Sequence, residues 1–187
     1  YNYSNNNDEN SQEWGSIEFS NLNIHHNDGR GFQLYYNNYA HVDLDSLHIH
    51  SNEYGFYMSS QYYPIEFNLT NSTIESNERD EIEFSYSNSS DPNVQVHFNH
   101  NTIRDTVNNS YYLVDLWGNG WDDDGYALPV DFRGNYWGAE ATDSLNAGSN
   151  PRDHDFFNDW YDYNRYPVVN YADFVGATVT TGNTAEL

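Results

Sequence analysis

Apolar residues alternate with polar ones in short runs that recur along the chain at nearly constant intervals. Each run has the form apolar-x-apolar-x-x-(Leu/Ser/Asn)-x-(Ile/Trp), and such alternation is typical of a half-buried β-strand. The five copies begin at positions 17, 42, 67, 96 and 130, so the successive spacings are 25, 25, 29 and 34 residues. A unit of this length cannot bury its own apolar face, and neighbouring units must therefore stack.

A second, shorter apolar stretch follows each of the first four copies. These stretches are Phe32-x-Leu34, Phe56-x-Met58, Ile82-x-Phe84 and Val114-x-Leu116. Polar loops rich in Asn, Ser and Tyr close the units, and we recognise no amphipathic helix of about ten residues or more before residue 153. Two or three short strands per repeat, joined by tight polar turns, describe one coil of a parallel β-solenoid.

Stacked coils make a specific prediction about the core, because side chains one repeat apart should lie over one another on strands about 4.8 Å apart. The predicted columns are Ile17/Val42/Phe67/Val96/Val130, Phe19/Leu44/Leu69/Phe98/Phe132 and Ile24/Ile49/Ile74/Ile103/Trp137. A polar column, Asn27/Asn52/Asn77, keeps the same 25-residue spacing. It fits a turn, because stacked Asn amides can bond one another and Asn tolerates left-handed backbone.

The C-terminal third carries three further motifs. They are Gly134-Asn135-Tyr136-Trp137-Gly138, Phe157-Asn158-Asp159-Trp160-Tyr161-Asp162 and Val168-Val169-Asn170-Tyr171. Together with the repeat, they resemble the right-handed parallel β-helices of the pectin-lyase-like superfamily, of the carbohydrate-binding and sugar-hydrolase type. The resemblance spans about residues 16–175. It implies the fold but no single function, because that superfamily includes lyases, hydrolases, epimerases, adhesins and inert spacers.

We therefore predict an all-β protein, a right-handed parallel β-helix of about five coils with a C-terminal closing segment. The predicted divisions are a polar N-terminal segment ordered by docking (1–15), the coils (16–138), the closing segment (139–175) and a β-prone tail (176–187).

The charge is strongly unbalanced. The 187 residues include 29 acidic and six basic side chains, all six of them Arg, for a net charge of −23. Such a chain repels polyanions, so we predict no nucleic-acid partner and no anionic membrane partner, whereas cations and neutral glycans fit. No apolar run reaches the length of a membrane span. The abundance of Asn (28) and Tyr (18) favours an extracellular or cell-surface location.

Two groups of carboxylates are candidate cation sites. Glu18 and Asp43 should stack on adjacent coils, and they would repel each other unless a cation bridges them or both are solvated. Asp122, Asp123 and Asp124 lie in the long insertion between the fourth and fifth repeats. Their oxygen ligands suit calcium, although the spacing is not that of an Asp-x-Asp-x-Asp-Gly loop. We predict no obligatory cofactor, with Ca²⁺ as the candidate ligand.

A third column combines His25, His50 and Glu75, which could hold zinc or copper. Arg104 occupies the next position of the column and would repel a cation. Chance placement of the eight His residues explains this column better than a metal site does.

Aromatic side chains are the main candidates for binding. Aromatic faces beside Asn and Asp suit sugar rings, subunit contacts or cover for the edge of the core. The predicted contact residues are Tyr35, Tyr57, Tyr63, Tyr112, Trp117 and Trp121.

Catalysis has little support in the sequence. Lys is absent, and the acid motifs of the polygalacturonase-like enzymes are not present as such. We predict no catalytic residue and a non-catalytic, extracellular structural or adhesive β-helix, in the preferred version a self-assembling fibre or surface-layer subunit. The alternative is a polysaccharide-active lyase or hydrolase, or a carbohydrate-binding module, of the same superfamily.

Overall fold

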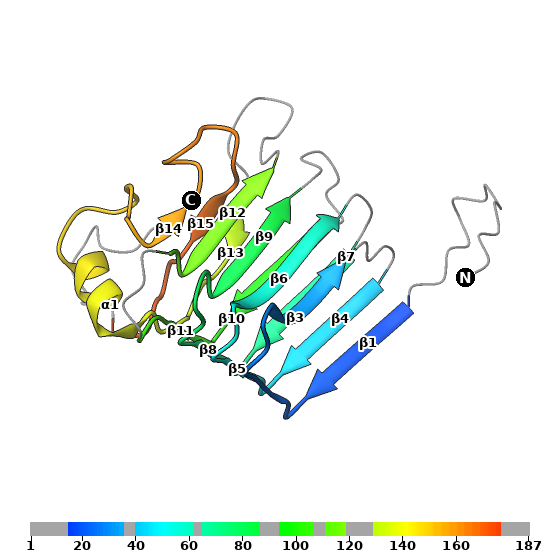
Figure 1. Ribbon diagram of the computed structural model, residues 1–187. Coiled ribbons are helices and arrows are strands. Elements are labelled where there is room, and N and C mark those ends of the chain that lie inside the picture. The colour runs from blue at the N-terminus through cyan, green and yellow to red at the C-terminus, as the bar shows by residue number, and fades with distance from the viewer. Residues whose placement is uncertain are drawn as a thin grey trace, which may run out of the picture.

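The computed structural model describes residues 15–35, 40–61, 65–86, 94–106, 111–118 and 129–176. These residues form an all-β parallel β-helix, as predicted, in which three parallel sheets run along the molecule (Figure 1). Up to β13 (Pro129–Asp131), successive strands pass from the first sheet (A) to the second (B) and the third (C), and then return to sheet A in the next coil. After α1 (Gly138–Asn146), β14 (Phe157–Asn158) joins sheet C and β15 (Val168–Asn170) joins sheet A. The predicted N-terminal segment lies outside the described residues up to position 14, as does the predicted tail from position 177 onward.

Each sheet collects equivalent strands of successive repeats. Sheet A contains β1 (Gly15–Ser20), β4 (Ala40–Asp45), β7 (Ile65–Thr70), β10 (Val94–Asn99), β13 (Pro129–Asp131) and β15 (Val168–Asn170). Sheet B contains β2 (Asn23–His25), β5 (His48–His50), β8 (Thr73–Glu75) and β11 (Thr102–Arg104). Sheet C contains β3 (Arg30–Tyr35), β6 (Tyr54–Gln61), β9 (Ile82–Tyr86), β12 (Val114–Gly118) and β14 (Phe157–Asn158).

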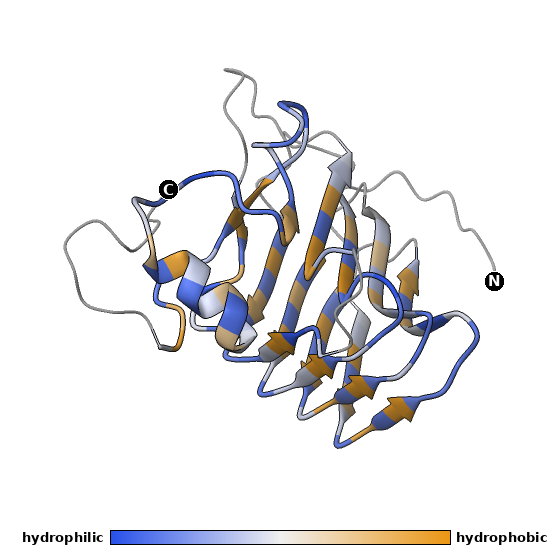
Figure 2. Ribbon diagram, turned by 60° about the vertical axis from the view of Figure 1, so that its left-hand side comes forward, coloured by the Kyte–Doolittle hydropathy of each residue, from blue (hydrophilic) through white to orange (hydrophobic). Residues whose placement is uncertain are grey.

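The register confirms the predicted core columns. Ile24, Ile49 and Ile74 are direct partners on neighbouring strands of sheet B. In sheet A, the rings of Phe98 and Phe132 stack 4.6 Å apart. Apolar and polar residues alternate along the strands in Figure 2, so each sheet turns one face to the shared core. Alignment of the repeats therefore predicted which side chains meet inside the molecule, even where the spacing lengthens from 25 to 34 residues.

Single left-handed residues turn the chain between sheets A and B. Asn21, Ser46, Asn71 and His100 all have φ between 50° and 58°, and Gly134 has φ 72° at the equivalent point of the following repeat. A second set, His26, Ser51 and Ser76, turns the chain after sheet B. These residues come directly before Asn27, Asn52 and Asn77. The asparagine column was thus predicted at the correct turn, but the left-handed conformation belongs to the residue that precedes each Asn.

The asparagine column forms a hydrogen-bonded ladder. The backbone N–H groups of Asn27 and Asn52 donate to the Oδ1 atoms of Asn52 and Asn77 (3.2 and 3.0 Å), and both side-chain amides donate to the same oxygens. The ladder ends on the buried carboxylate of Glu81, which accepts from the Asn77 backbone N–H at 3.2 Å and from its side-chain amide. Gly31 lies against the Asn52 side chain and Gly55 against that of Asn77, so a Cβ at either position would enter the ladder.

The two ends of the β-helix differ. At the C-terminal end, α1 (Gly138–Asn146) covers the last coils, and its Ala141 and Leu145 are buried. This nine-residue helix begins one residue before the predicted closing segment, and it is shorter than the helices of about ten residues or more for which the sequence was searched. At the N-terminal end, Phe19 remains 44% exposed, and Ile17 and Ile24 are only partly buried. Among the described residues, no strand pairs with the outer edge of β1.

Candidate functional site

The outer face of sheet C carries a row of polar side chains on consecutive strands. Alternation along β3, β6, β9, β12 and β14 points every second residue away from the core, and one such residue of each strand belongs to the row. The register joins these residues directly, and we call them the outer row: Gln33, Tyr57, Glu83, Asp115 and Asn158. Stacking thus brings two carboxylates, Glu83 and Asp115, onto adjacent strands.

Arg30 organises one end of the outer row. Its guanidinium carbon lies 3.5 Å from the centre of the Tyr57 ring, and its Nη2 lies 3.5 Å from Glu83 Oε2. The guanidinium therefore covers the Tyr57 ring, which is only 7% exposed, while it pairs with the next residue in the row. The 3.5 Å contact is long for a hydrogen bond, so Glu83 Oε2 has no close donor among the described residues.

Burial alters the acidity of both carboxylates. It raises the pKa of Glu83, although the neighbouring Arg30 charge opposes this shift. Burial also raises the pKa of Asp115 to about 6, against the hydrogen bond that Asn158 Nδ2 donates to Asp115 Oδ1 at 2.6 Å. The negative charges of Asp80 and Glu83 add to the shift of Asp115. Perturbed carboxylates gathered in one place are a common mark of a functional site.

Aromatic side chains flank the outer row. Trp117, two residues after Asp115, is 37% exposed, and its side chain is a hydrogen-bond partner of Glu83. Tyr35 is 50% exposed on β3, the first strand of the same sheet. The half-buried Tyr112 donates its backbone N–H to Asp80 Oδ1 at 3.0 Å, close to the start of β12.

The structure brings three of the six predicted contact residues, Tyr35, Tyr57 and Trp117, onto one face of sheet C. Tyr112 lies next to the acidic end of this face, near Asp80. The other two, Tyr63 and Trp121, lie outside the described residues.

The carboxylates predicted to bind a cation are arranged as follows. Glu18 and Asp43 are direct partners on β1 and β4, as the repeat predicted. Asn68 Nδ2 donates to Asp43 Oδ1 at 2.9 Å, which gives this carboxylate a protein partner. Asp122, Asp123 and Asp124 lie outside the described residues. Within the described part of the chain, no three His, Asp or Glu side chains are grouped so that they could hold a metal ion.

The histidine column on sheet B also forms as the spacing predicted. His25 pairs with His50 and their rings stack 5.0 Å apart, while Glu75 follows on the next strand. Arg104 Nε donates to Glu75 Oε2 at 2.6 Å, and His48 Nε2 contacts Glu75 Oε1 at 3.0 Å. Glu75 is therefore held by an ion pair with Arg104 and by a side-chain contact with His48.

Sequence reasoning missed Arg30, Glu83, Asp115 and Asn158 as members of one site. A signal was present for two of them, because Glu83 and Asp115 are the outward residues of the short apolar-x-apolar strands Ile82-x-Phe84 and Val114-x-Leu116. Those strands were used to predict the core, and their outward positions were not aligned.

Comparison of the chain with protein-family models, curated proteins and solved structures finds no match. In the described part of the chain, no helix is long and apolar enough to cross a membrane.

Proposed function

We propose that the chain is an extracellular, non-catalytic adhesive β-helix, of the pectin-lyase-like type, whose sheet C face binds a neutral glycan. The observation that supports this proposal best is the outer row, which places Glu83, Asp115 and Asn158 beside the exposed indole of Trp117. Carboxylate and amide groups hydrogen-bond sugar hydroxyls, and the indole face packs on a sugar ring. A net charge of −23 disfavours polyuronates, so an uncharged chain is the better ligand.

Trp117→Ala should weaken glycan binding by about tenfold or more, because stacked aromatic contacts contribute on the order of 1 kcal/mol beyond the area they bury. Trp160→Ala is the matched control, since Trp160 has nearly the same exposure (38%) but lies on the closing segment. A glycan array would identify the ligand, and calorimetry on the best neutral oligosaccharide would compare the variants. Equal losses in both variants, or binding of polyuronates alone, would contradict the proposal.

A second candidate is hydrolysis of a polysaccharide. The raised pKa of Asp115, about 6, favours it, because glycosidases pair a carboxyl group that holds its proton with a second, ionised carboxylate, and Glu83 lies on the adjacent strand. A reducing-sugar assay on neutral polysaccharides separates the two functions. Turnover by the unmodified chain that disappears in Asp115→Asn would establish the enzyme and overturn the non-catalytic assignment.

We also propose that the chain associates with copies of itself, because that step would build the predicted fibre or surface layer. The N-terminal coil supports it, because Phe19 is exposed and β1 offers an unpaired strand edge in the described structure. Phe19→Ser should shift an oligomer to monomer in light scattering after size-exclusion chromatography. Phe156→Ser, at the opposite end, serves as control, and an unchanged oligomer in Phe19→Ser would exclude this end as the contact.

A further inference from the structure

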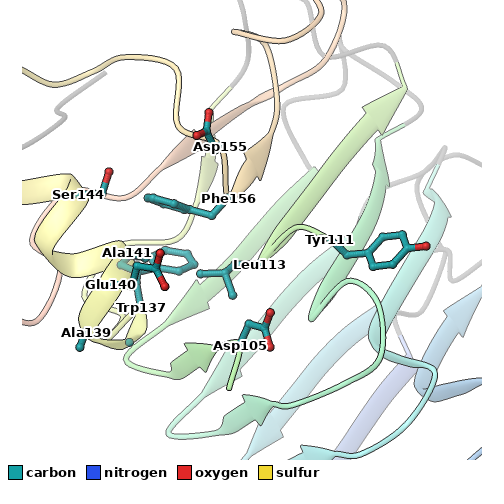
Figure 3. Close-up of a pocket in the computed structure, with 11 residues that line it drawn as sticks. Asp105, Tyr111, Leu113, Trp137, Ala139, Glu140, Ala141, Ser144, Asp155 and Phe156 are labelled. Atoms are coloured by element: carbon teal, nitrogen blue, oxygen red, sulfur yellow. The ribbon is translucent and has the colours of Figure 1, made fainter. Parts of the chain in front are cut away.

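A pocket of about 350 Å³ opens between α1 and the coil ends beside it (Figure 3). Four separate segments build its walls: the start of α1 with the residue before it, the residue after β11, the stretch before β12, and the stretch that leads into β14. The pocket is remote in sequence from Arg30 and Glu83, and none of the outer row lines it. It therefore requires an explanation independent of the proposed glycan site.

The floor of the pocket is apolar and largely preformed. Trp137 is 1% exposed, Leu113 is also buried, and Phe156 is half-buried. Small residues of α1, Gly138 and Ala141, leave the space open above them. A concave apolar floor with a few polar groups around it is the usual form of a small-molecule site.

The polar groups around this floor are predominantly acidic. Asp105, Glu140 and Asp155 line the pocket from three different segments, and Figure 3 shows them on separate sides of it. The described lining contains no Lys, Arg or His. These carboxylates are spread around the pocket, and no three acidic or imidazole groups among the described residues converge on a point where a metal ion could bind. The negative charge is therefore distributed around the pocket rather than gathered at one point.

We propose that this pocket binds a small organic ammonium compound that also carries a hydroxyl group. The ammonium group would lie beside the half-buried Phe156 ring, where cation–π attraction and the surrounding carboxylates both favour it. The hydroxyl oxygen would face the first turn of α1, because no side chain caps the N–H groups there. Glu140 in that first turn offsets the positive end of the helix, so the cation is not repelled.

The test is calorimetry of the full chain with choline, and with the neutral alcohol in which carbon replaces the nitrogen of choline. Choline should bind saturably at one site, and the neutral analogue should bind at least about tenfold more weakly. Glu140→Gln and Asp105→Asn should each weaken choline binding several-fold, because each removes one charge from the pocket rim. Asp143→Asn is the matched control, since Asp143 is exposed on the same helix and does not line the pocket.

Three outcomes would overturn the proposal. One is the absence of saturable choline binding, and another is equal binding of choline and its neutral analogue. The third is an affinity that falls equally in Asp143→Asn and in Glu140→Gln, which would indicate general attraction to a chain of high negative charge. Glycan binding by these variants should not change, so failure here is distinguishable from failure of the proposed function.

Discussion

Gly55→Ala should unfold the chain, or lower its free energy of unfolding by more than about 4 kcal/mol, the range reached when a substitution disrupts a packed core. A Cβ at position 55 would lie 2.2 Å from the backbone oxygen of Glu81, 2.8 Å from Asn77 Nδ2 and 3.0 Å from Ile74 Cγ2. The Glu81 backbone belongs to the next coil, and it cannot move away without breaking the pairing of strands in sheet C. The end of the asparagine ladder would be displaced with it.

Two glycines at the equivalent place in the preceding coil provide graded controls. Gly29→Ala should change stability by less than about 1 kcal/mol, because nothing lies within 4 Å of the added Cβ. Gly31→Ala should be intermediate, since its closest contacts, Asn52 Nδ2 at 2.6 Å and Ile49 Cγ2 at 2.7 Å, are side-chain atoms that can shift. Urea denaturation, monitored by circular dichroism, would rank the three variants by their loss of stability. If Gly29→Ala and Gly55→Ala lowered the free energy of unfolding equally, the asparagine ladder would not fill the space beside Gly55.

The core and the first three coils could be predicted because their spacing is strictly periodic. A step of 25 residues places Val42 between Ile17 and Phe67 whatever the loops contain, and the register confirms this. The end of the ladder could not be predicted in the same way. After position 77 the repeat lengthens to 29 residues, and the acceptor that replaces the next Asn is Glu81, only four residues further along the chain.

The candidate site was only partly predictable, for a related reason. The outer row joins positions 33, 57, 83, 115 and 158, so its steps are 24, 26, 32 and 43 residues, and no constant spacing reveals it. Aromatic composition did indicate Tyr57 and Trp117. The exposure of each depends on its neighbours in space: Arg30 covers Tyr57, whereas Trp117 remains accessible. Whether an aromatic ring is covered depends on how side chains of different coils pack, and the sequence alone does not reveal that packing.

Helix α1 shows the same limit at the C-terminal end. It has nine residues and buries only Ala141 and Leu145 as apolar side chains larger than Gly. So short a segment has little periodicity to recognise, and its stability comes from packing on the last coils rather than from its own sequence. The motif at 134–138 runs into the first residue of this helix, while the helix itself was visible only in the structure.

Glu81 should make the chain less stable as the pH rises from about 4.5 to about 8. The side chain is 1% exposed, and burial raises its pKa from 4.5 to about 8 although Asn77 donates two hydrogen bonds to it. The folded chain therefore holds this proton more tightly than the unfolded chain does. Stability from this group is fully present below pH 4.5, and it is lost as the pH rises through the folded-state value, by on the order of a few kcal/mol.

Glu81→Gln should remove this pH dependence, because an amide does not ionise. The same substitution should lower stability below pH 4.5, since its NH₂ group cannot accept the hydrogen bond that one carboxyl oxygen takes from Asn77. Glu78→Gln is the matched control: it removes one carboxylate three residues away, on an exposed side chain. Urea midpoints measured across this pH range would compare the three chains. If the dependence of stability on pH persisted in Glu81→Gln and disappeared in Glu78→Gln, Glu81 would be ionised in the folded chain. Its hydrogen bonds from Asn77 would then lower its pKa by more than burial raises it.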